Sequence, residues 1–472
     1  MASNQVRDFG EVFTPIEFIE NKIIPRIYAT KGAKWFENIH LKIADIACGS
    51  GNFLIVIFPH LFKAQRKYFS SDEECERWIV ENELYGRDIQ RCNVITTQVA
   101  VDKNNLVPNN PHFNCGDTLS KDFDWWGVER FDLIIGNPPY QKSVEGRDDN
   151  SSKNIYYDFV YAAKKKSDFV IQIIMSKWVE DEGNDCIKFR ENMLNSSLVE
   201  LHDYFDSHKV FPKFTRLPSG CCWFIWDKNY DGNTKVFTFV NNEVVEREVD
   251  MNREIFYRHP KMKSIITKVA SKTKYWMDEC VSSMDPFLLK KNNRDMGIPD
   301  NRKFRDVRAE KSEEYSQPIF YVAKQGARIS LQYTKPEYVK SNEEYVNCYK
   351  LFFGKAGCPV DKELDNRVFA PMKIAKSGEI VACSMCIILK KFENMTELLN
   401  CKKYMDSRFV RFLHGMGKPS INATKRTWKY VPDVVDYSKD WTDERIYEHF
   451  GLSKDEVDAI ESFVLPFTKD DE

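Results

Sequence analysis

Short apolar runs that stop at a glycine, a proline or a charged residue recur through the first half of the chain. Runs of strand length lie at 43–47, 83–86, 131–136 and 168–175. Each is bounded by turn or polar residues and is too short for a buried helix, so we expect buried strands there. Apolar stripes at helical spacing begin at residue 52 and cover 155–165. Strands that alternate with helices predict an α/β fold around an open, doubly wound sheet.

A different pattern occupies the second half. Strands are expected at 318–323 and 380–389, and the apolar segment 409–413 is expected to lie in a helix. Ser453 and Glu456 have the spacing of a capping box, which predicts the start of a C-terminal helix. The chain is therefore expected to divide into an α/β domain over 1–245, an α+β domain over 246–430 and a small helical cap over 431–472.

The tetrapeptide Asn137-Pro138-Pro139-Tyr140 directly follows the predicted strand at 131–136. Neither proline can donate to a sheet ladder, so the strand must end here, and the carboxyl edge of an open α/β sheet is where ligands bind. The side-chain oxygen of Asn137 and the carbonyl of Pro138 are both acceptors. Together they could take the two hydrogens of a planar amine, with the ring of Tyr140 stacked beside it. An ordinary turn is the alternative interpretation.

A glycine turn, Cys48-Gly49-Ser50-Gly51, lies between the strand at 43–47 and the helix that follows it. Small residues in such a turn let the backbone approach a ligand closely. A dinucleotide-binding turn is disfavoured because Leu54 stands at the place of its third glycine. A phosphate loop is disfavoured because no Lys-Ser or Lys-Thr pair follows.

These two stretches, together with Phe13-Thr14-Pro15, resemble the motifs of the gamma class of S-adenosylmethionine-dependent DNA adenine-N6 methyltransferases of the restriction-modification type. The resemblance implies a doubly wound, seven-stranded, Rossmann-like methyltransferase domain followed by a C-terminal α+β target-recognition domain. It implies methyl transfer to the exocyclic N6 amine of an adenine that is flipped out of double-stranded DNA. The implied catalytic residues are Asn137, Pro138, Pro139 and Tyr140.

The resemblance also implies a site for S-adenosylmethionine. Its expected residues are Phe13, Thr14, Pro15, Asp45, Ala47, Cys48, Gly49, Gly51, Asp88 and Asp117. Asp45 and the glycine turn are expected to hold the amino-acid end, Asp88 the ribose and Asp117 the adenine amine. Helix capping is the alternative for Asp88 and Asp117. Because Asp88 stands far from the glycine turn, residues 60–82 are expected to form an inserted helix or an enlarged crossover.

A second aromatic ring is expected to stack on the flipped base, opposite Tyr140. The segment 209–212 resembles the family motif that supplies this ring, which points to Phe211. Phe214 is the substitute, and a phenylalanine of the hydrophobic core is the alternative interpretation.

Charge adds a local argument for DNA. The net charge of −2 gives none by itself, but the segments 251–310 and 408–429 are rich in Lys and Arg. We expect phosphate contacts in these segments from Lys261, Lys263, Arg408, Arg411, Lys425 and Arg426. A solvated basic face is the alternative interpretation.

Other features of the sequence limit the cellular setting. The chain has no run of about 18 apolar residues and begins with a polar segment, so neither a membrane span nor a secretory signal is expected. Its 13 cysteines, without an export signal, favour a reducing cytoplasm. No metal site is expected, because the close pair Cys383 and Cys386 has no second pair of ligands at suitable spacing. We expect a monomeric cytoplasmic protein, for which a separate cognate restriction endonuclease is a candidate partner.

Competing functions would use the same residues. An amine-accepting tetrapeptide would also suit a methyltransferase that acts on cytosine N4, on RNA or on a protein glutamine. A catalytically silent DNA-recognition subunit is a further alternative, which the intact Asn137 and Tyr140 disfavour. The large second domain and its basic segments favour double-stranded DNA over RNA or protein.

Overall fold

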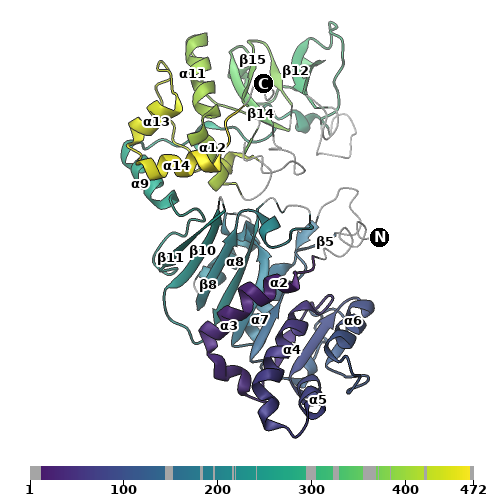
Figure 1. The fold of residues 1–472 in the computed structure, drawn as a ribbon. Helices are drawn as coiled ribbons and strands as arrows, with labels where there is room; N and C mark the ends of the chain where they lie inside the picture. Colours follow the sequence, from purple (N-terminus) through teal and green to yellow (C-terminus); the bar gives the residue numbers. More distant parts are fainter. Residues whose placement is uncertain are drawn as a thin grey trace. The chain divides into compact units, whose positions relative to one another are not determined.

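A computed structural model of the protein describes residues 12–143, 152–180, 184–194, 197–214, 217, 219–240, 242–293, 304–322, 329–354, 368–369, 371–382, 384–418 and 423–467. The chain divides into two compact units, Met1–Phe256 and Tyr257–Glu472, each with its own hydrophobic core (Figure 1). No helix in these described ranges is long and apolar enough to cross a membrane.

The first unit is built on a nine-stranded sheet with the order β11-β10-β8-β9-β7-β4-β1-β2-β3. Its strands are β1 (Ile43–Asp45), β2 (Leu84–Asp88), β3 (Phe113–Cys115), β4 (Leu133–Gly136), β7 (Phe169–Met175), β8 (Leu198–Tyr204), β9 (Cys221–Asp227), β10 (Thr234–Val240) and β11 (Glu243–Val249). Strands β3, β2, β1, β4 and β7 run parallel, and β9 lies antiparallel between β7 and β8. The predicted α/β class and the predicted strands of the first half are confirmed.

Helices cover both faces of this sheet, because alternate residues of each strand point to opposite sides. Leu133 and Ile135 pack in one core with residues of α3 (Ile24–Lys31), α4 (Asn52–Gln65) and α5 (Asp72–Asn82). Ile134, between them, packs in a second core with residues of α7 (Tyr156–Lys166) and α8 (Asn184–Leu194). Figure 1 shows the two sets of helices on either side of the strands. The other α-helices among the described residues of this unit are the three-residue α2 (Ile16–Phe18) and the longer α6 (Arg91–Val101).

The first unit differs from the prediction in strand number and in its end. Strands β10 and β11 extend the sheet beyond the seven expected strands, since β10 pairs with β8 and β11 pairs with β10. A boundary at residue 245 would cut β11 in its middle, and the unit continues to Phe256. The expected insertion within 60–82 is helix α5, which Ser71 caps by accepting a hydrogen bond from the amide of Glu74.

The second unit is an α+β structure with two three-stranded sheets, β13-β12-β16 and β15-β14-β17. The strands are β12 (Gln317–Tyr321), β13 (Ser330–Thr334), β14 (Lys350–Gly354), β15 (Lys373–Ala375), β16 (Ile380–Val381) and β17 (Met385–Ile387). The helices are α9 (Met262–Lys272), α10 (Met277–Cys280), α11 (Met395–Asp406), α12 (Arg408–Met416), α13 (Asp443–Phe450) and α14 (Lys454–Phe463). The single strand expected at 380–389 is thus two short strands that belong to different sheets.

The C-terminal helices are part of this second unit rather than a separate cap. Both α13 and α14 pack on α12, and one compact unit runs to the end of the chain. Helix α14 does begin with the predicted capping box, in which Ser453 and Glu456 each bond the other's backbone amide. The described residues of the predicted cap, 431–467, therefore belong to the second unit, in which α13 and α14 pack on α12.

Two of the predicted phosphate contacts are internal contacts in the structure. Arg411 is 1% exposed, and its guanidinium donates to the carbonyls of Asp406 and Leu465 at 3.0 and 2.7 Å. Arg408 pairs with the carboxylates of Asp443 and Glu461. The prediction of phosphate contact is wrong for Arg411, and Arg408 is engaged by acidic partners. The reason is that α13 and α14 cover helix α12, which the local sequence does not record.

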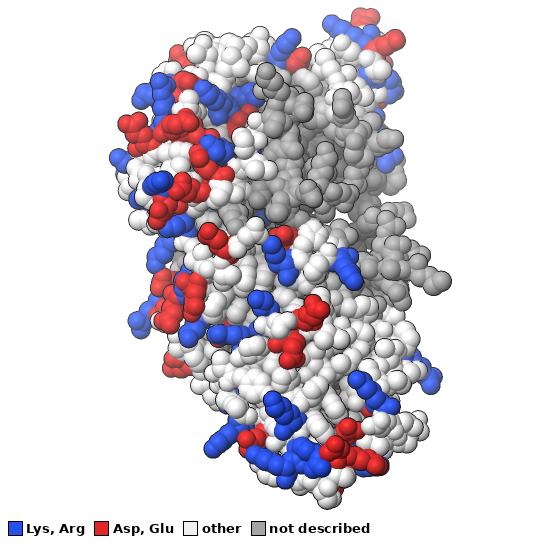
Figure 2. All heavy atoms as spheres, in the orientation of Figure 1, with Lys and Arg blue, Asp and Glu red and all other residues white. Residues whose placement is uncertain are grey.

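The other predicted contacts remain at the surface. Lys425 and Arg426 are exposed on a 3-10 turn, Lys425–Trp428, and Lys263 is exposed on α9. Lys261 is partly exposed and lies 3.4 Å from the carboxylate of Asp455. On the face drawn in Figure 2, basic and acidic side chains of this unit are interspersed rather than separated.

Replacement of Arg411 tests its structural role. We expect Arg411→Met to lower the free energy of unfolding of the second unit by about 2–4 kcal/mol, because two carbonyls would be deprived of a charged donor inside the core. The measurement is the urea midpoint followed by circular dichroism. Lys425→Met, the same change at an exposed site, is the control and should alter stability by less than about 0.5 kcal/mol. Equal midpoints for both variants would contradict the assignment.

Candidate active site

A cavity of about 350 Å³ lies at the carboxyl ends of the parallel strands of the first unit. This is a normal size for a small-molecule site, and the position is the ligand-binding edge of an open α/β sheet. Its lining comes from Val12–Thr14, the segment after β1, and the residues that follow β2, β3 and β4. Of the predicted cofactor residues, Phe13, Thr14, Asp45, Ala47, Cys48, Gly49, Asp88 and Asp117 line the cavity, as do all four residues of the tetrapeptide. Pro15 and Gly51 do not line it.

The glycine turn needs its glycines for backbone conformation. Gly49 has φ +52° and Gly51 has φ +82°, both in the left-handed region that favours glycine. A Cβ on Gly51 would also lie 2.8 Å from the side chain of Thr97. The amide of Gly49 donates to Asp88 Oδ2 at 3.0 Å, which joins the turn to the end of β2. Gly51 therefore acts on the pocket through the shape of the turn.

Asp45 ends β1 and is 1% exposed. Burial, with a further contribution from the nearby charge of Asp88, raises the pKa of its carboxyl to about 8. Its Oδ1 accepts a hydrogen bond from the amide of Ala47 at 3.2 Å. The carboxyl is thus mostly neutral at pH 7, and a cation placed beside it would favour the ionised form.

The other two predicted carboxylates also support turns. Asp88 accepts from the amide of Gln90 at 2.8 Å and from the side chain of Asn93 at 3.2 Å, in addition to Gly49. Asp117 is exposed and accepts from the amide of Leu119 at 2.9 Å. Neither carboxylate caps a helix, because Gln90 is the N-cap of α6 and the next helical turn after Asp117 has Asp124 as its N-cap. The helix-capping alternative is therefore wrong for both, and both carboxylates line the cavity.

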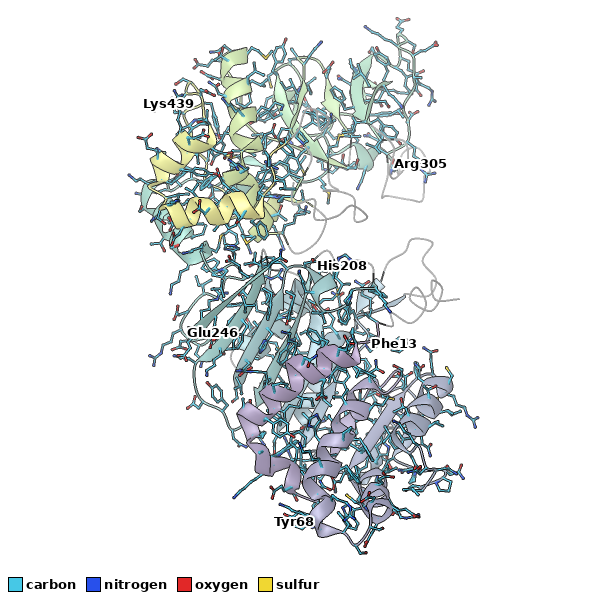
Figure 3. All side chains as sticks on the ribbon, viewed as in Figure 1. Phe13, Tyr68, His208, Glu246, Arg305 and Lys439 are labelled. Carbon is cyan, nitrogen blue, oxygen red and sulfur yellow. The ribbon has the colours of Figure 1, made fainter. Side chains whose placement is uncertain are left out.

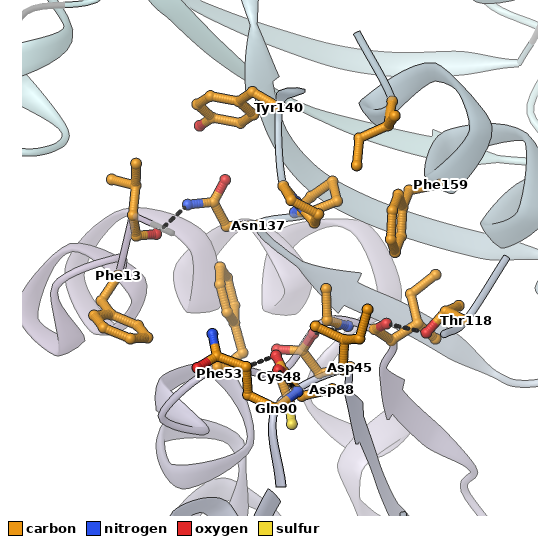
Figure 4. Close-up of a pocket in the computed structure, with 18 of the residues that line it drawn as sticks. Phe13, Asp45, Cys48, Phe53, Asp88, Gln90, Thr118, Asn137, Tyr140 and Phe159 are labelled. Atoms are coloured by element: carbon orange, nitrogen blue, oxygen red, sulfur yellow. Dashed lines mark hydrogen bonds between the residues drawn. The ribbon is translucent and has the colours of Figure 1, made fainter. Parts of the chain in front are cut away.

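The side-chain amide of Asn137 is held in one orientation (Figure 4). Its Nδ2 donates to the carbonyl of Val12 at 2.7 Å, whereas its Oδ1 is buried without a hydrogen-bond partner. A carbonyl can only accept, so it must face the NH2 group and leave the oxygen free. The oxygen points toward Tyr140, whose buried hydroxyl interacts with the Asn137 side chain and has no other described partner. The ring of Tyr140 is 5% exposed and meets Tyr156 edge to face.

Phe211 lies outside this site. It is 3% exposed, packs in the core shared by α3 and α4, and does not line the cavity. Phe214 is half-buried against the same core. The structure thus favours the alternative interpretation of Phe211 as a core residue. A local aromatic motif cannot distinguish the two roles, because the difference lies in what packs over the ring.

The cavity also contains residues that the sequence analysis did not select. Ile89, 55% exposed, and Phe159 on the apolar stripe of α7 contribute apolar walls. Asn52, the first residue of α4, donates to the carbonyl of Thr14 at 2.8 Å. Two features of the sequence could have identified such residues. Ile89 is an apolar residue directly after the acidic end of β2, and Asn52 is a polar residue directly after the glycine turn.

No group of three or more His, Cys, Asp or Glu residues that could hold a metal ion occurs among the described residues. Of the close cysteine pair, Cys386 is buried in β17 and Cys383 lies outside the described residues.

Known proteins resemble this chain in the same region. Residues 53–211 match the family model described as Eco57I restriction-modification methylase. A protein of Mycoplasma pneumoniae, named an uncharacterized adenine-specific methylase, is 34% identical over 161 residues. That match covers 31% of this chain and 38% of the relative, so the chain spans well under half of the relative's length.

A solved structure resembles the whole chain in fold. It is the Type IIL restriction-modification enzyme MmeI in complex with DNA, with a TM-score of 0.55 and 12% sequence identity. The similarity covers 99% of this chain and 78% of that chain. At this identity the similarity concerns the fold alone. The family match includes the tetrapeptide and two of the acidic strand ends, so residues 53–211 resemble the Eco57I restriction-modification methylase domain.

Proposed function

We propose that the protein is a DNA methyltransferase that modifies the N6 amine of adenine with S-adenosylmethionine as the methyl donor. The observation that carries the proposal is the free oxygen of Asn137, which Val12 orients at the edge of a cavity that also contains a buried carboxyl. The family match and the name of the Mycoplasma pneumoniae relative support the same activity.

The residues of the cavity fit this cofactor chemically. Asp45 is a buried carboxyl that would pair with the cationic amino-acid end, and Thr14 Oγ1 is buried without a partner. Asp88 and Asp117 present acceptor oxygens for ribose hydroxyls and an adenine amine, and Ile89 and Phe159 present apolar faces. When bound, S-adenosylmethionine supplies an electrophilic methyl group, whose carbon–sulfur electron pair returns to sulfur as the amine nitrogen takes the methyl and releases a proton to water.

The protein's part is to orient and activate the amine. An adenine amine is a poor nucleophile because its lone pair is delocalised into the ring. Asn137 Oδ1 and the Pro138 carbonyl would accept its two hydrogens, which draws the nitrogen toward tetrahedral geometry and aims the lone pair. Since Val12 fixes the amide, this acceptor needs little reorganisation at the moment of transfer. Tyr140, held by the two prolines, would stack on the extruded base.

DNA binding is proposed for the second unit as a target-recognition domain. An adenine inside a duplex must leave the stack to reach the cavity, so the backbone must be held on either side. Lys261, Lys263, Lys425 and Arg426 are the surface candidates for phosphate contact, whereas Arg411 is buried on internal carbonyls and Arg408 is paired with Asp443 and Glu461.

Substitution of Asn137 tests the proposal directly. Asn137→Ala should slow single-turnover methyl transfer at least about 100-fold, the usual effect of removing one oriented polar group from a transition state. DNA and cofactor affinities should change little. Transfer of tritiated methyl groups to duplex DNA is the measurement. Tyr140→Phe, which keeps the stacking ring, is the matched control and should retain most of the activity. A wild-type rate for Asn137→Ala would show that the tetrapeptide is only a turn.

The raised pKa of Asp45 predicts proton release on cofactor binding. The free carboxyl has a pKa of about 8, and a bound cation lowers it, so at pH 7 binding should release close to one proton. Affinity should accordingly rise with pH, by up to about tenfold per unit, and level off above about pH 8. Calorimetry of S-adenosylmethionine binding in two buffers of different ionisation enthalpy measures this release. Asp45→Asn should bind more weakly and release none; proton release by that variant would contradict the assignment.

Charge reversal tests the proposed phosphate contacts. Lys425→Glu or Arg426→Glu should weaken binding to all duplexes alike, and the log–log salt slope should fall by about 0.9 for each phosphate that the protein no longer neutralises. Lys454→Glu, at an exposed lysine of the same unit, is the control. Two results would argue against phosphate binding by these side chains. One is a loss of affinity that differs between DNA sequences, and the other is a salt slope equal to that of the wild-type protein.

A further inference from the structure

Residues 12–14 cross the rim of the cavity and are held at both ends by asparagine side chains. We call this segment the N-terminal strap. The carbonyl of Val12 accepts from Asn137 Nδ2 at 2.7 Å, and the carbonyl of Thr14 accepts from Asn52 Nδ2 at 2.8 Å. The two asparagines belong to different elements, the end of β4 and the start of α4. The strap therefore links the glycine turn to the catalytic tetrapeptide.

Asn52 is itself held in one orientation. Its Oδ1 accepts from the hydroxyl of Ser50 at 2.9 Å, and its NH2 group faces the Thr14 carbonyl, so both ends of the amide have suitable partners. It directly follows Gly51, whose left-handed conformation begins α4. Because both ends of its amide are hydrogen-bonded at the start of α4, Asn52 is an anchor with a defined position.

The middle of the strap also contacts the glycine turn. A Cβ on Gly49 would lie 2.8 Å from Cε1 of Phe13, so the Phe13 ring rests against the turn. Figure 3 labels Phe13 just before helix α2, where half of its surface remains exposed. Thr14 is 2% exposed, and the backbone enters α2 directly after Pro15. The path of the strap is thus determined by Asn52, the turn and α2, and not by Asn137 alone.

This path decides which atom of the Asn137 amide is bonded and which is left without a partner. With Val12 in place, a half-turn of the Asn137 amide would set its oxygen against the Val12 carbonyl, and two acceptors repel. With Val12 displaced, the Tyr140 hydroxyl is the remaining described group that interacts with the Asn137 side chain, and a hydroxyl can pair with either end of an amide. The amide could then rotate, and the NH2 group would face the target amine in part of the molecules.

We propose that Asn52 is a positioning residue for methyl transfer, which orients the Asn137 oxygen through the N-terminal strap. The inference rests on the proposed function. Asn52 need not touch the target amine, since its contact is the Thr14 carbonyl at the other end of the strap. Removal of the Asn52 anchor should reduce the rate constant of transfer rather than the affinity for DNA.

Two variants and one matched control separate this role from general destabilisation. Asn52→Ala removes the donor, and Asn52→Asp keeps the shape but sets an acceptor against the Thr14 carbonyl. Asn82→Ala is the control, because Asn82 also donates its side-chain NH2 to a backbone carbonyl, that of Trp78 at 3.0 Å, but lies in α5 and does not line the cavity. All three are made in the full chain.

The first measurement needs neither cofactor nor DNA. Thermolysin cleavage between Val12 and Phe13, identified by the mass of the product, reports how often the strap leaves its site. We expect Asn52→Ala to raise the cleavage rate about fivefold, the effect of removing one hydrogen bond on the open population. Asn137→Ala should raise it similarly, since it removes the other anchor, and Asn82→Ala should not. An unchanged cleavage rate in Asn52→Ala would contradict the inference that Asn52 holds the N-terminal strap in place.

The second measurement is a double-mutant cycle on single-turnover methyl transfer at saturating cofactor and DNA. Asn52→Ala should lower the rate constant by up to about twofold in the wild-type background, which is the loss when the freed amide occupies both orientations equally, and should have no further effect in Asn137→Ala, because no oxygen remains to be oriented. Equal reductions in both backgrounds, or a reduction confined to cofactor affinity, would overturn the proposal. Absence of transfer by the wild-type protein would instead refute the proposed function, and the cleavage measurement would still decide whether Asn52 holds the strap.

Discussion

The parallel pairing of β1 with β4 is the constraint on which the site depends. Its register sets Ile43 opposite Leu133 and Ala44 opposite Ile134, so that Asp45 comes beside the end of β4. A Cβ on Gly136 would lie 2.5 Å from Asp45 Oδ1, which means that only glycine leaves room for the carboxylate there. The next residue is Asn137. One pair of hydrogen-bonded strands therefore brings the buried carboxyl and the oriented amide together at a single edge.

Burial then gives these groups their properties. A carboxyl in water would be ionised at neutral pH, but Asp45 is enclosed and its pKa rises to about 8. The oxygen of Asn137, the hydroxyl of Tyr140 and the hydroxyl of Thr14 are buried without hydrogen-bond partners, an arrangement that proteins normally avoid. Several unpaired polar atoms around one cavity are an unfavourable feature of the free protein. They become favourable when a ligand supplies a cation and hydrogen-bond donors.

In the second unit, tertiary packing decides whether a basic side chain has a structural role or stays available at the surface. Helix α12 carries Arg408 and Arg411 in a sequence that also suits an exposed basic face. Because α13 and α14 close over it, Arg411 satisfies backbone carbonyls inside the core and Arg408 pairs with two carboxylates. Lys425 and Arg426, a short distance along the chain, stay exposed on a 3-10 turn. The planar guanidinium of arginine holds several N–H donors in a fixed arrangement. It can therefore satisfy buried carbonyls as well as bind phosphate.

Local pattern was sufficient for much of the fold and for the centre of the site. The strands that end at Asp45, Asp88 and Gly136 are short apolar runs stopped by glycine, proline or charge, and the α/β class follows from such runs. The motif residues around the cavity were selected by their resemblance to methyltransferase motifs. These features depend on residues close together in the chain, whose preferences can be read in order.

Tertiary structure alone decided the contacts between distant segments. The added strands β10 and β11, the core position of Phe211 and the burial of Arg411 each depend on what packs against a segment from far along the chain. The bond from Asn137 to Val12 joins residues 125 positions apart, and no local preference of either residue encodes it. The sequence by itself therefore determined which side chains could accept from an amine, whereas the folded structure determined which of their atoms is left without a partner, because orientation is set by partners that only folding brings together.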